Sequence, residues 1–319
     1  MHRLLTLLFV LALALPAAAA ARAADKLTVM LDWFVNPDHA TLVVARERGY
    51  FKAQGLEVEL IAPADPNDPP KLVAAGKADI AVSYQPQLHV QVAQGLPLLR
   101  FGTLVATPLN SLVVLRDGPV RAIADLKGRK IGYSVGGFED ALLKAMLEKH
   151  GLKLSDVTLV NVNFSLSPAL ISGQVDAVIG AFRNFELNQM DIVGRPGRVF
   201  FVEEEGVPAY DELILVAHRE RLGDGRMRRF LDALEQGTQY LINHPKESWQ
   251  LFIAAYKDRD DELNRRAWGD TLPRFALRPA ALDRVRYERF AAFLAAQKII
   301  PEALEIGRYA VELPAATRP

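Results

Sequence analysis

The segment at residues 32–39, Asp-Trp-Phe-Val-Asn-Pro-Asp-His, combines two aromatic rings with carboxylate, amide and imidazole groups. It follows a β-prone run at 27–31 and precedes a helix-prone run, and ligands of parallel sheets bind at the carboxyl ends of the strands. The candidate ligand-binding residues of this segment are Asp32, Trp33, Asn36, Asp38 and His39. The alternative is that Trp33 and Phe34 pack inside the protein and that Asp38 only caps the helix.

A second candidate segment, Gly-Ala-Phe-Arg-Asn-Phe-Glu at 180–186, also follows a strand-like run. Asn184 and Glu186 are its ligand-binding candidates. These two residues stand between aromatic residues and could present an amide and a carboxylate to a flat heterocycle. If the heterocycle is an aminopyrimidine, the carboxylate can accept a hydrogen bond from the exocyclic amine or pair with a protonated ring nitrogen. Tyr84, which follows the apolar run 80–82, is a third candidate. We expect all three segments at the same end of successive strands.

A glycine-containing turn precedes a further helix-prone run. Gly136 and Gly137 resemble an anion-binding turn at a helix N-terminus, but the acidic residues Glu139 and Asp140 would repel phosphate. The turn is therefore either a capped helix start or a site where backbone amides and Glu139 bind an uncharged ligand. On the second interpretation its ligand-binding residues are Gly136, Gly137, Phe138 and Glu139.

The apolar pattern predicts alternating strands and helices, which is typical of an α/β fold with mainly parallel sheets covered by helices on both faces. Strands are predicted at 27–31, 57–61, 80–82, 98–105, 111–115, 129–133, 158–160, 175–179, 199–202 and 213–217. Helices are predicted at 39–48, 70–75, 85–94, 136–150 and 168–172, and in an almost wholly helical C-terminal part at 226–243, 245–256, 259–269 and 279–296.

Two blocks of the chain resemble each other. Residues 71–81 and 168–178 each run from a helix end through a glycine (Gly76 or Gly173) and an aspartate three residues later into a strand. The glycine is suited to a left-handed helix stop, and the aspartate can bond to the following turn. The pair favours two βα domains of related design.

Residues 1–23 have the pattern of a secretory signal peptide. A short n-region with Arg3 precedes an apolar run at 4–15, Pro16 breaks it, and Ala21-Arg22-Ala23 supplies a cleavage site. The apolar run is too short for the ~20 residues of a membrane-spanning helix. We expect cleavage near Ala23 and a soluble mature protein in the periplasm.

The composition argues against several functions. Lysine plus arginine equals aspartate plus glutamate at 38 each, so the chain lacks the basic excess of a nucleic-acid binder. It has no cysteine, which removes disulfides and thiolate chemistry. No G-x-S-x-G, P-loop or H-E-x-x-H motif occurs, and no two of the six histidines have ligand spacing. We therefore expect neither an enzyme nor a metal site or cofactor.

Longer stretches of the sequence resemble a known family. LDWFVNPDHATLVVARERGYFKAQGLEVEL, GKADIAVSY, LKGRKIGY and GAFRNFE are similar to the pyrimidine-binding branch of the solute-binding proteins of ABC importers, a branch related to yeast thiamine-pyrimidine synthase. The pieces RGYFKAQGLEVEL and LKGRKIG mark the wider superfamily of nitrate, sulfonate and taurine binders. The pattern around Trp33, Asn36 and His39 and that around Asn184 and Glu186 mark the thiamine-precursor branch.

The resemblance implies a two-lobed periplasmic binding protein of type II that closes on its ligand. Lobe 1 would comprise 24–117 and 210–319, including the C-terminal helices, and lobe 2 would comprise 118–209. The ligand would be a thiamine pyrimidine precursor, formylamino- or hydroxymethyl-pyrimidine. The partners would be a permease in the inner membrane and its ATPase, and the binding protein itself would be a monomer.

The synthase of this family uses a lysine, a histidine and a cysteine-rich motif, and here Ser83 and Gln87 stand at the aligned lysine and histidine positions. The family often has an aromatic residue where this chain has Arg183. The alternatives are a binding protein for another solute (riboflavin, or an anion such as a sulfonate or nitrate) and, from another class, an exported enzyme. An anion site would require arginine, lysine or helix N-termini.

Overall fold

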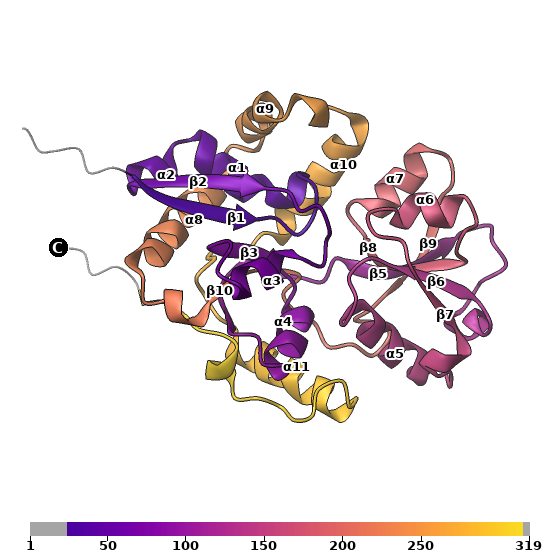
Figure 1. Cartoon of the computed structure of the whole chain (residues 1–319). Helices are drawn as coiled ribbons and strands as arrows, with labels where there is room; N and C mark the ends of the chain where they lie inside the picture. The colour runs from indigo at the N-terminus through magenta and orange to yellow at the C-terminus, as the bar shows by residue number, and fades with distance from the viewer. Residues whose placement is uncertain (1–23, 315–319) are drawn as a thin grey trace, which may run out of the picture.

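The computed structural model describes residues 24–314. The predicted signal peptide lies outside the described residues. Two five-stranded sheets lie side by side, each with helices around it (Figure 1). The expected two-lobed α/β architecture is confirmed. Among residues 24–314, no helix is both long and apolar enough to cross a membrane.

The first sheet has the strand order β2-β1-β3-β10-β4. Its strands are β1 (Asp25–Met30), β2 (Leu56–Ile61), β3 (Ile80–Ser83), β4 (Leu98–Val105) and β10 (Leu213–His218). Its helices are α1 (Ala40–Glu47), α2 (Tyr50–Ala53), α3 (Pro69–Ala74), α4 (Gln85–Ala93), α8 (Gly225–Asn243), α9 (Pro245–Ala255), α10 (Glu262–Thr271) and α11 (Arg284–Ala296). A 3-10 turn, η1 (Pro37–His39), precedes α1.

The second sheet has the strand order β7-β6-β8-β5-β9. Its strands are β5 (Asn110–Leu115), β6 (Lys130–Tyr133), β7 (Thr158–Asn161), β8 (Ala177–Phe182) and β9 (Gly197–Phe201). Its helices are α5 (Glu139–Lys149), α6 (Leu166–Ile171) and α7 (Glu186–Ile192). In each sheet one strand, β10 or β5, runs antiparallel to its neighbours, so both sheets are mainly parallel.

Alternation along the strands explains why both faces of the first sheet are covered. Along β10, Leu213 and Leu215 pack into the core formed with α1 and α8, whereas Ile214 and Val216 pack into a separate core formed with α4 and α11. Successive strand residues point to opposite faces, so an unbroken apolar run supplies both cores at once.

The two similar blocks have the same local structure in both lobes. Gly76 and Gly173 end α3 and α6 with φ of 70° and 75°, which is the left-handed region that glycine adopts without strain. The Asp79 side chain accepts a hydrogen bond from the backbone N–H of Thr28 in β1 (2.9 Å), and Asp176 does the same for Lys130 in β6 (2.9 Å). The aspartates therefore tie each strand to its neighbour, and do not bond to the following turn.

The first passage of the chain between the sheets differs from the sequence prediction. The strand predicted at 111–115 is expected in lobe 1, which would extend to residue 117. In the structure β5 lies inside the second sheet, where Val113 pairs with Val178 of β8 and Val199 of β9. The crossing therefore lies at 106–109, and the chain returns over 202–212. An apolar strand pattern identifies a strand but contains no information about which sheet it joins.

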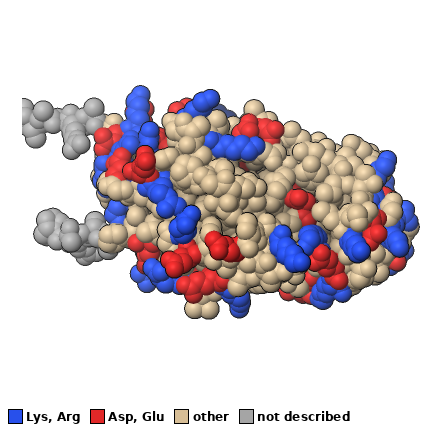
Figure 2. Space-filling model, turned by 60° about the horizontal axis from the view of Figure 1, so that its bottom comes forward, with Lys and Arg blue, Asp and Glu red and all other residues tan. Residues whose placement is uncertain are grey.

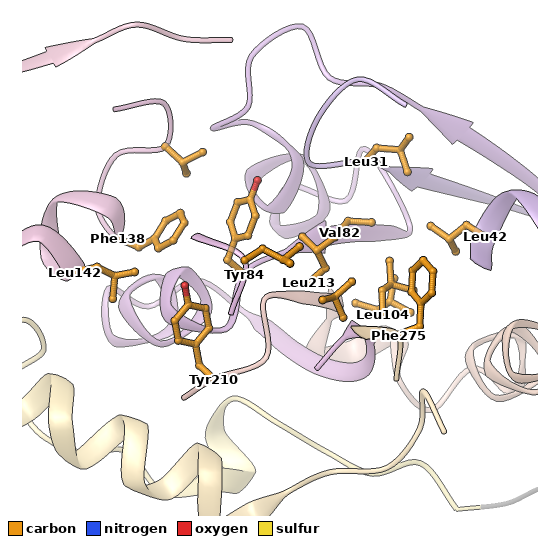
Figure 3. Close-up of a cluster of buried hydrophobic side chains, with 14 of the residues drawn as sticks. Leu31, Leu42, Val82, Tyr84, Leu104, Phe138, Leu142, Tyr210, Leu213 and Phe275 are labelled. Atoms are coloured by element: carbon orange, nitrogen blue, oxygen red, sulfur yellow. The ribbon is translucent and has the colours of Figure 1, made fainter. Parts of the chain in front are cut away.

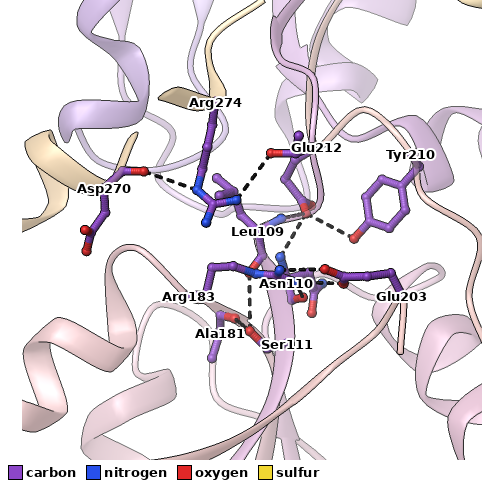
Figure 4. Close-up of polar contacts among 11 residues, drawn as sticks. Leu109, Asn110, Ser111, Ala181, Arg183, Glu203, Tyr210, Glu212, Asp270 and Arg274 are labelled. Carbon is purple, nitrogen blue, oxygen red and sulfur yellow. Dashed lines mark hydrogen bonds and ion pairs between the residues drawn. The ribbon is translucent and has the colours of Figure 1, made fainter. Parts of the chain in front are cut away.

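The two connections are bonded to each other (Figure 4). Glu212, at the end of the second connection, accepts hydrogen bonds from the backbone N–H groups of Leu109 (2.6 Å) and Asn110 (2.8 Å) and from the hydroxyl of Tyr210 (3.0 Å). Burial raises the pKa of Glu212 to about 7. The carboxyl group thus fixes the position at which both chain segments pass between the lobes.

One face of the molecule carries charges of both signs (Figure 2). Lysine and arginine side chains are interspersed with acidic ones on the face in Figure 2, around an uncharged area in its middle. This agrees with the zero formal net charge of the chain.

Two helical glycines provide a test of the packing between α1 and α8. A Cβ built on Gly237 would lie 2.6 Å from the Cβ of Ala45, whereas one built on Gly269 in α10 meets nothing within 4 Å. We expect Gly237→Ala to lower the free energy of unfolding by about 1–3 kcal/mol and Gly269→Ala to raise it by up to about 1 kcal/mol. Urea unfolding of both variants checks this, and a stabilised Gly237→Ala protein would contradict the packing.

Candidate functional site

A narrow cleft opens between the lobes where strands of both sheets end. Its empty space, including its mouth, is about 380 Å³. Lobe 1 lines it from the ends of β1 and β3, and lobe 2 lines it from β8 and the starts of α5, α6 and α7. The lining residues are Asp32, Trp33, Asn36, Asp38, Tyr84, Glu139, Leu166, Gly180, Phe182, Phe185 and Glu186.

Asp32 is the centre of the polar network on the lobe 1 side. It follows β1 and is buried, and one carboxylate oxygen accepts a hydrogen bond from Nε2 of His39 (2.9 Å) while the other accepts from the hydroxyl of Tyr84 (2.9 Å). Nδ1 of His39 accepts from the backbone N–H of Asn36 (3.3 Å). Both nitrogens of this fully buried ring are thus occupied. His39 orients Asp32 from behind and is not itself in the cleft lining.

The turn before α1 explains the spacing of residues 36–39. The Asn36 side-chain oxygen accepts a hydrogen bond from the backbone N–H of Asp38 (2.8 Å), and the His39 ring bonds back to the Asn36 backbone. This is a capping box around η1, with Pro37 at its first position. The cap holds Asn36 and Asp38 against the cleft. The capping side chain is that of Asn36 and not that of Asp38, whose carboxylate bonds to Asn184 and Thr271 instead.

Aromatic rings from the two lobes pack against each other around the cleft. Tyr84 of lobe 1 stacks on Phe138 of lobe 2, with ring centroids 4.9 Å apart and planes at 24° (Figure 3). Trp33 of lobe 1 meets Phe164 of lobe 2 edge-to-face at 4.5 Å, and it packs with the apolar core of lobe 2. Each such pair contributes about 0.5–1.5 kcal/mol beyond its buried area, so the aromatic walls also hold the lobes together.

Lobe 2 supplies two buried carboxyl groups. Glu139 accepts a hydrogen bond from the backbone N–H of Ser134 (2.8 Å), and Glu186 accepts one from the backbone N–H of Phe182 (2.7 Å). Burial raises the pKa of each to about 8, because transfer out of water disfavours the charged form. Both groups can therefore gain or lose a proton near neutral pH.

Gly180 makes room for one of these carboxyl groups. Its φ is +97°, and a Cβ built there would lie 2.4 Å from Oε1 of Glu139. Only glycine combines this backbone conformation with the close approach of a carboxylate. Gly180 in β8 thus leaves space for Glu139, which belongs to the same lobe.

Asp38 and Asn184 join the two lobes directly. The Asn184 amide donates hydrogen bonds to Oδ1 of Asp38 (2.6 Å) and to the hydroxyl of Thr271 at the end of α10 (2.7 Å), and that hydroxyl lies 3.0 Å from the same Asp38 oxygen. Burial raises the pKa of Asp38 to about 6. Asn184 therefore bridges the lobes beside the cleft and is absent from its lining.

The glycine turn differs most from the sequence prediction. Gly136 and Gly137 are exposed and lie outside the lining of the cleft. The Gly136 N–H donates to Asn67 (3.0 Å) and the Gly137 N–H to Asp140 (2.8 Å). Neither amide is free for a ligand: the Gly137 N–H bonds within the first turn of α5, and the Gly136 N–H bonds to lobe 1. Phe138 stacks on Tyr84 and only Glu139 of this turn reaches the lining.

Four lining residues were not predicted from the sequence: Leu166, Gly180, Phe182 and Phe185. Gly180 and Phe182 belong to β8, which continues to residue 182, so alternation along a longer strand would have found them. Arg183 points away from the cleft, as its ion pair with Glu203 shows (2.6 Å). Among residues 24–314, no group of three or more His, Asp or Glu side chains is arranged to hold a metal ion.

The chain is similar to proteins of thiamine metabolism. The model of the family described as "NMT1/THI5 like" matches residues 36–248. A Haemophilus influenzae protein named "Putative thiamine biosynthesis protein" is 56% identical over 293 residues, 91% of this chain and 93% of that protein. The formylaminopyrimidine-binding protein of Halalkalibacterium halodurans is 33% identical over 264 residues, which are 82% of this chain and 78% of that protein.

Other similarities extend to an enzyme and to solved structures. The 4-amino-5-hydroxymethyl-2-methylpyrimidine phosphate synthase of Schizosaccharomyces pombe is 28% identical over 252 residues, 76% of this chain and 72% of the enzyme. The alkanesulfonate-binding protein SsuA of Xanthomonas axonopodis pv. citri, bound to MOPS, has a TM-score of 0.71 at 18% identity and covers 90% of this chain and 98% of its own. A Candida albicans gene product with the generic periplasmic binding protein fold has a TM-score of 0.73 at 17% identity. The match covers 92% of this chain and 99% of that protein.

Two sheets joined by two crossings, with a cleft between them, define a protein of the periplasmic-binding-protein fold. Within that class, the chain belongs to the NMT1/THI5-like family.

The raised pKa of Glu186 predicts how stability depends on pH. A carboxyl group whose folded pKa is about 8 and whose unfolded value is 4.5 stabilises the fold fully below pH 4.5 and loses that contribution as the pH rises through 8. Glutamine mimics the protonated acid. We expect Glu186→Gln to match the original protein near pH 5 and to exceed its unfolding free energy by at least about 1 kcal/mol at pH 8.5.

Urea unfolding of both proteins at the two pH values is the measurement. The exposed residue Glu288 provides the control, because Glu288→Gln should leave the difference between the pH values unchanged. The same stability difference for Glu186→Gln at pH 5 and at pH 8.5 would contradict the assignment of a buried carboxyl group.

Proposed function

We propose that the protein is the solute-binding component of an ABC importer and binds a thiamine pyrimidine precursor between its lobes. The observation that carries the proposal is the chemistry of the cleft. Aromatic rings form its walls, four carboxyl groups face it (Asp32, Asp38, Glu139 and Glu186), and no lysine or arginine is among the lining residues. A flat heterocycle with N–H donors is chemically complementary to these groups.

The carboxyl groups favour an aminopyrimidine in a specific way. Its exocyclic amine has hydrogens for carboxylate oxygens, and its ring nitrogen is a base. Glu186, with a pKa of about 8, can donate a hydrogen bond to the ring nitrogen as the acid, and as the carboxylate it can form a charge-assisted hydrogen bond with a protonated ring nitrogen. Glu139, on the same lobe and with the same raised pKa, is available to the amine.

The same features argue against an anion as the solute. A sulfonate or nitrate brings negative charge and only acceptor atoms, and in this cleft it would face carboxyl groups without a cationic partner. Bringing like charges together in a buried site costs several kcal/mol. We therefore infer that this protein shares its fold with sulfonate-binding proteins but binds a different solute.

A binding protein is favoured over a synthase by the residues near β3. The hydroxyl of Ser83 donates to Oε1 of Gln87 (2.9 Å), and both side chains are buried. These are the positions that align with the synthase lysine and histidine. Neither side chain can form an imine or act as an imidazole, and the chain contains no cysteine for an iron-binding motif. We therefore infer uptake of a pyrimidine without chemical conversion.

We propose a periplasmic location and a permease partner for this protein as well. An N-terminal signal peptide ending near Ala23 would send the protein to the periplasm, where it would act as a monomer. It would deliver the pyrimidine to a permease in the inner membrane driven by an ATPase. The two connections at 106–109 and 202–212 are the positions about which the lobes would open and close.

Calorimetry on the mature protein tests the solute. We expect 4-amino-5-hydroxymethyl-2-methylpyrimidine or its formylamino relative to bind one molecule per chain and to be recovered unchanged. Methanesulfonate, MOPS, nitrate and riboflavin serve as the comparison set and should give no heat of binding. Binding of a sulfonate alone would overturn the assignment of a pyrimidine as the solute. Conversion of the pyrimidine would overturn the assignment as a binding protein.

Two variants, measured by the same calorimetry, test which side chain contributes to pyrimidine binding. Glu186→Gln removes one charge-assisted hydrogen bond, a loss of roughly 1.5–3 kcal/mol, and so should weaken pyrimidine binding about ten- to a hundredfold. Arg183→Ala is the control, since its guanidinium pairs with Glu203 and stacks on Phe201 outside the cleft. Abolished binding in Arg183→Ala with unaltered binding in Glu186→Gln would point to an anion.

A further inference from the structure

Thr271 lies far from the other cleft residues in sequence but meets two of them in space. It is the last residue of α10 and is fully buried. Its hydroxyl accepts a hydrogen bond from the Asn184 amide of lobe 2 (2.7 Å) and lies 3.0 Å from Oδ1 of Asp38 in lobe 1. It also lies 2.7 Å from the Ala267 carbonyl one turn earlier, so its single hydrogen has two acceptors within reach.

Both hydrogens of the Asn184 side-chain amide are used in this contact. The Asn184 amide has two hydrogens, and its two acceptors are Asp38 Oδ1 (2.6 Å) and the Thr271 hydroxyl (2.7 Å). All three side chains are at most 2% exposed. One residue of lobe 2 is thus held by two residues of lobe 1 that are 233 positions apart in sequence.

We propose that Thr271 is a positioning residue and that Asp38, Asn184 and Thr271 form a clasp that holds the lobes closed, also before a ligand binds. The clasp serves ligand binding in a second way. It uses Oδ1 of Asp38, a residue of the cleft lining, and so fixes the orientation in which that carboxyl group faces the cleft. The effect on pyrimidine affinity rests on the proposed function, whereas the effect on closure does not.

Opening of the lobes costs free energy because it separates the hydrogen-bond partners of the clasp. When lobe 2 moves away, Asn184 leaves both acceptors, and these polar groups must find water instead. A second bond reinforces the contact, because the side chain of Asn188 in α7 donates to Asp270 in α10 (2.8 Å). The end of α10 therefore contacts lobe 2 at two points, and the closed arrangement is favoured by the pair.

The chain contains a matched control for Thr271. Thr238 in α8 is a threonine with 1% exposure whose hydroxyl donates to the carbonyl of Leu234 one turn earlier (2.9 Å). The Thr271 hydroxyl lies in the same way 2.7 Å from the carbonyl of Ala267. Thr238 lies within lobe 1 and has no hydrogen bond to lobe 2. Replacing either threonine by valine keeps the shape and removes the hydroxyl, so only Thr271→Val should affect the clasp.

The absence of cysteine allows a direct measurement of closure. Lys77→Cys in lobe 1 and Lys153→Cys in lobe 2, both at exposed positions, would carry a pair of spin labels. Their distance distribution is recorded without ligand and with saturating 4-amino-5-hydroxymethyl-2-methylpyrimidine, in the otherwise unaltered chain and in Thr271→Val, Thr271→Ser and Thr238→Val. Stopped-flow measurement gives the rates of pyrimidine binding and release.

We expect Thr271→Val to lower the ratio of closed to open protein about tenfold without ligand and to weaken pyrimidine binding correspondingly, mainly through faster release. Thr271→Ser should restore both, and Thr238→Val should alter neither. An unchanged distance distribution in Thr271→Val, or an original protein without a closed population before ligand addition, overturns the clasp. Failure of every protein to bind the pyrimidine, with Thr271→Val still opening the lobes, overturns the proposed function and supports the clasp.

Discussion

Four carboxyl groups are buried at one cleft without a basic side chain in its lining, and the surrounding structure is arranged to tolerate them. Each is satisfied by a neutral donor: a backbone N–H for Glu139 and Glu186, a tyrosine hydroxyl and an imidazole for Asp32, an amide and a hydroxyl for Asp38. Desolvation of acids in this setting raises the pKa, and it does so for the two glutamates and for Asp38. A ligand that brings N–H groups relieves this cost, and an anion increases it.

This constraint accounts for local features that otherwise have no common cause. Gly180 leaves space for the carboxyl group of Glu139, and the capping box at 36–39 presents Asp38 to the cleft. Glu212 fastens the two connections between the lobes, while the Tyr84–Phe138 stack and the clasp of Asp38, Asn184 and Thr271 hold the lobes near the cleft. The lobes are thus joined on one side by the chain itself and near the cleft by side chains that separate on opening.

Much of the fold follows from the sequence because periodicity and glycine positions are local signals. The existence and order of β1, β3 and β8 were predictable, and this placed Asp32, Tyr84 and Glu186 together. The sheet to which β5 belongs was not, since strand pairing is decided by neighbours far along the chain.

The site was predictable to the same extent. Residues directly after strands were found, whereas Gly180 and Phe182 were passed over because the end of β8 was set too early. Gly136 and Gly137 were assigned to the ligand because a glycine turn before a helix has two uses, and only the contacts with Asn67 and Asp140 distinguish them. Thr271 has no local motif, and its role arises solely from the packing of α10 against lobe 2.

The most direct test of the central claim is a crystal structure of the protein grown with 4-amino-5-hydroxymethyl-2-methylpyrimidine. We expect the ring between the aromatic walls of the cleft, with its exocyclic amine or ring nitrogen within about 3 Å of a carboxylate oxygen of Glu186 or Glu139. A pyrimidine bound elsewhere on the protein, or a ring in the cleft whose nitrogens contact neither glutamate, would contradict the claim that buried carboxyl groups select the ligand.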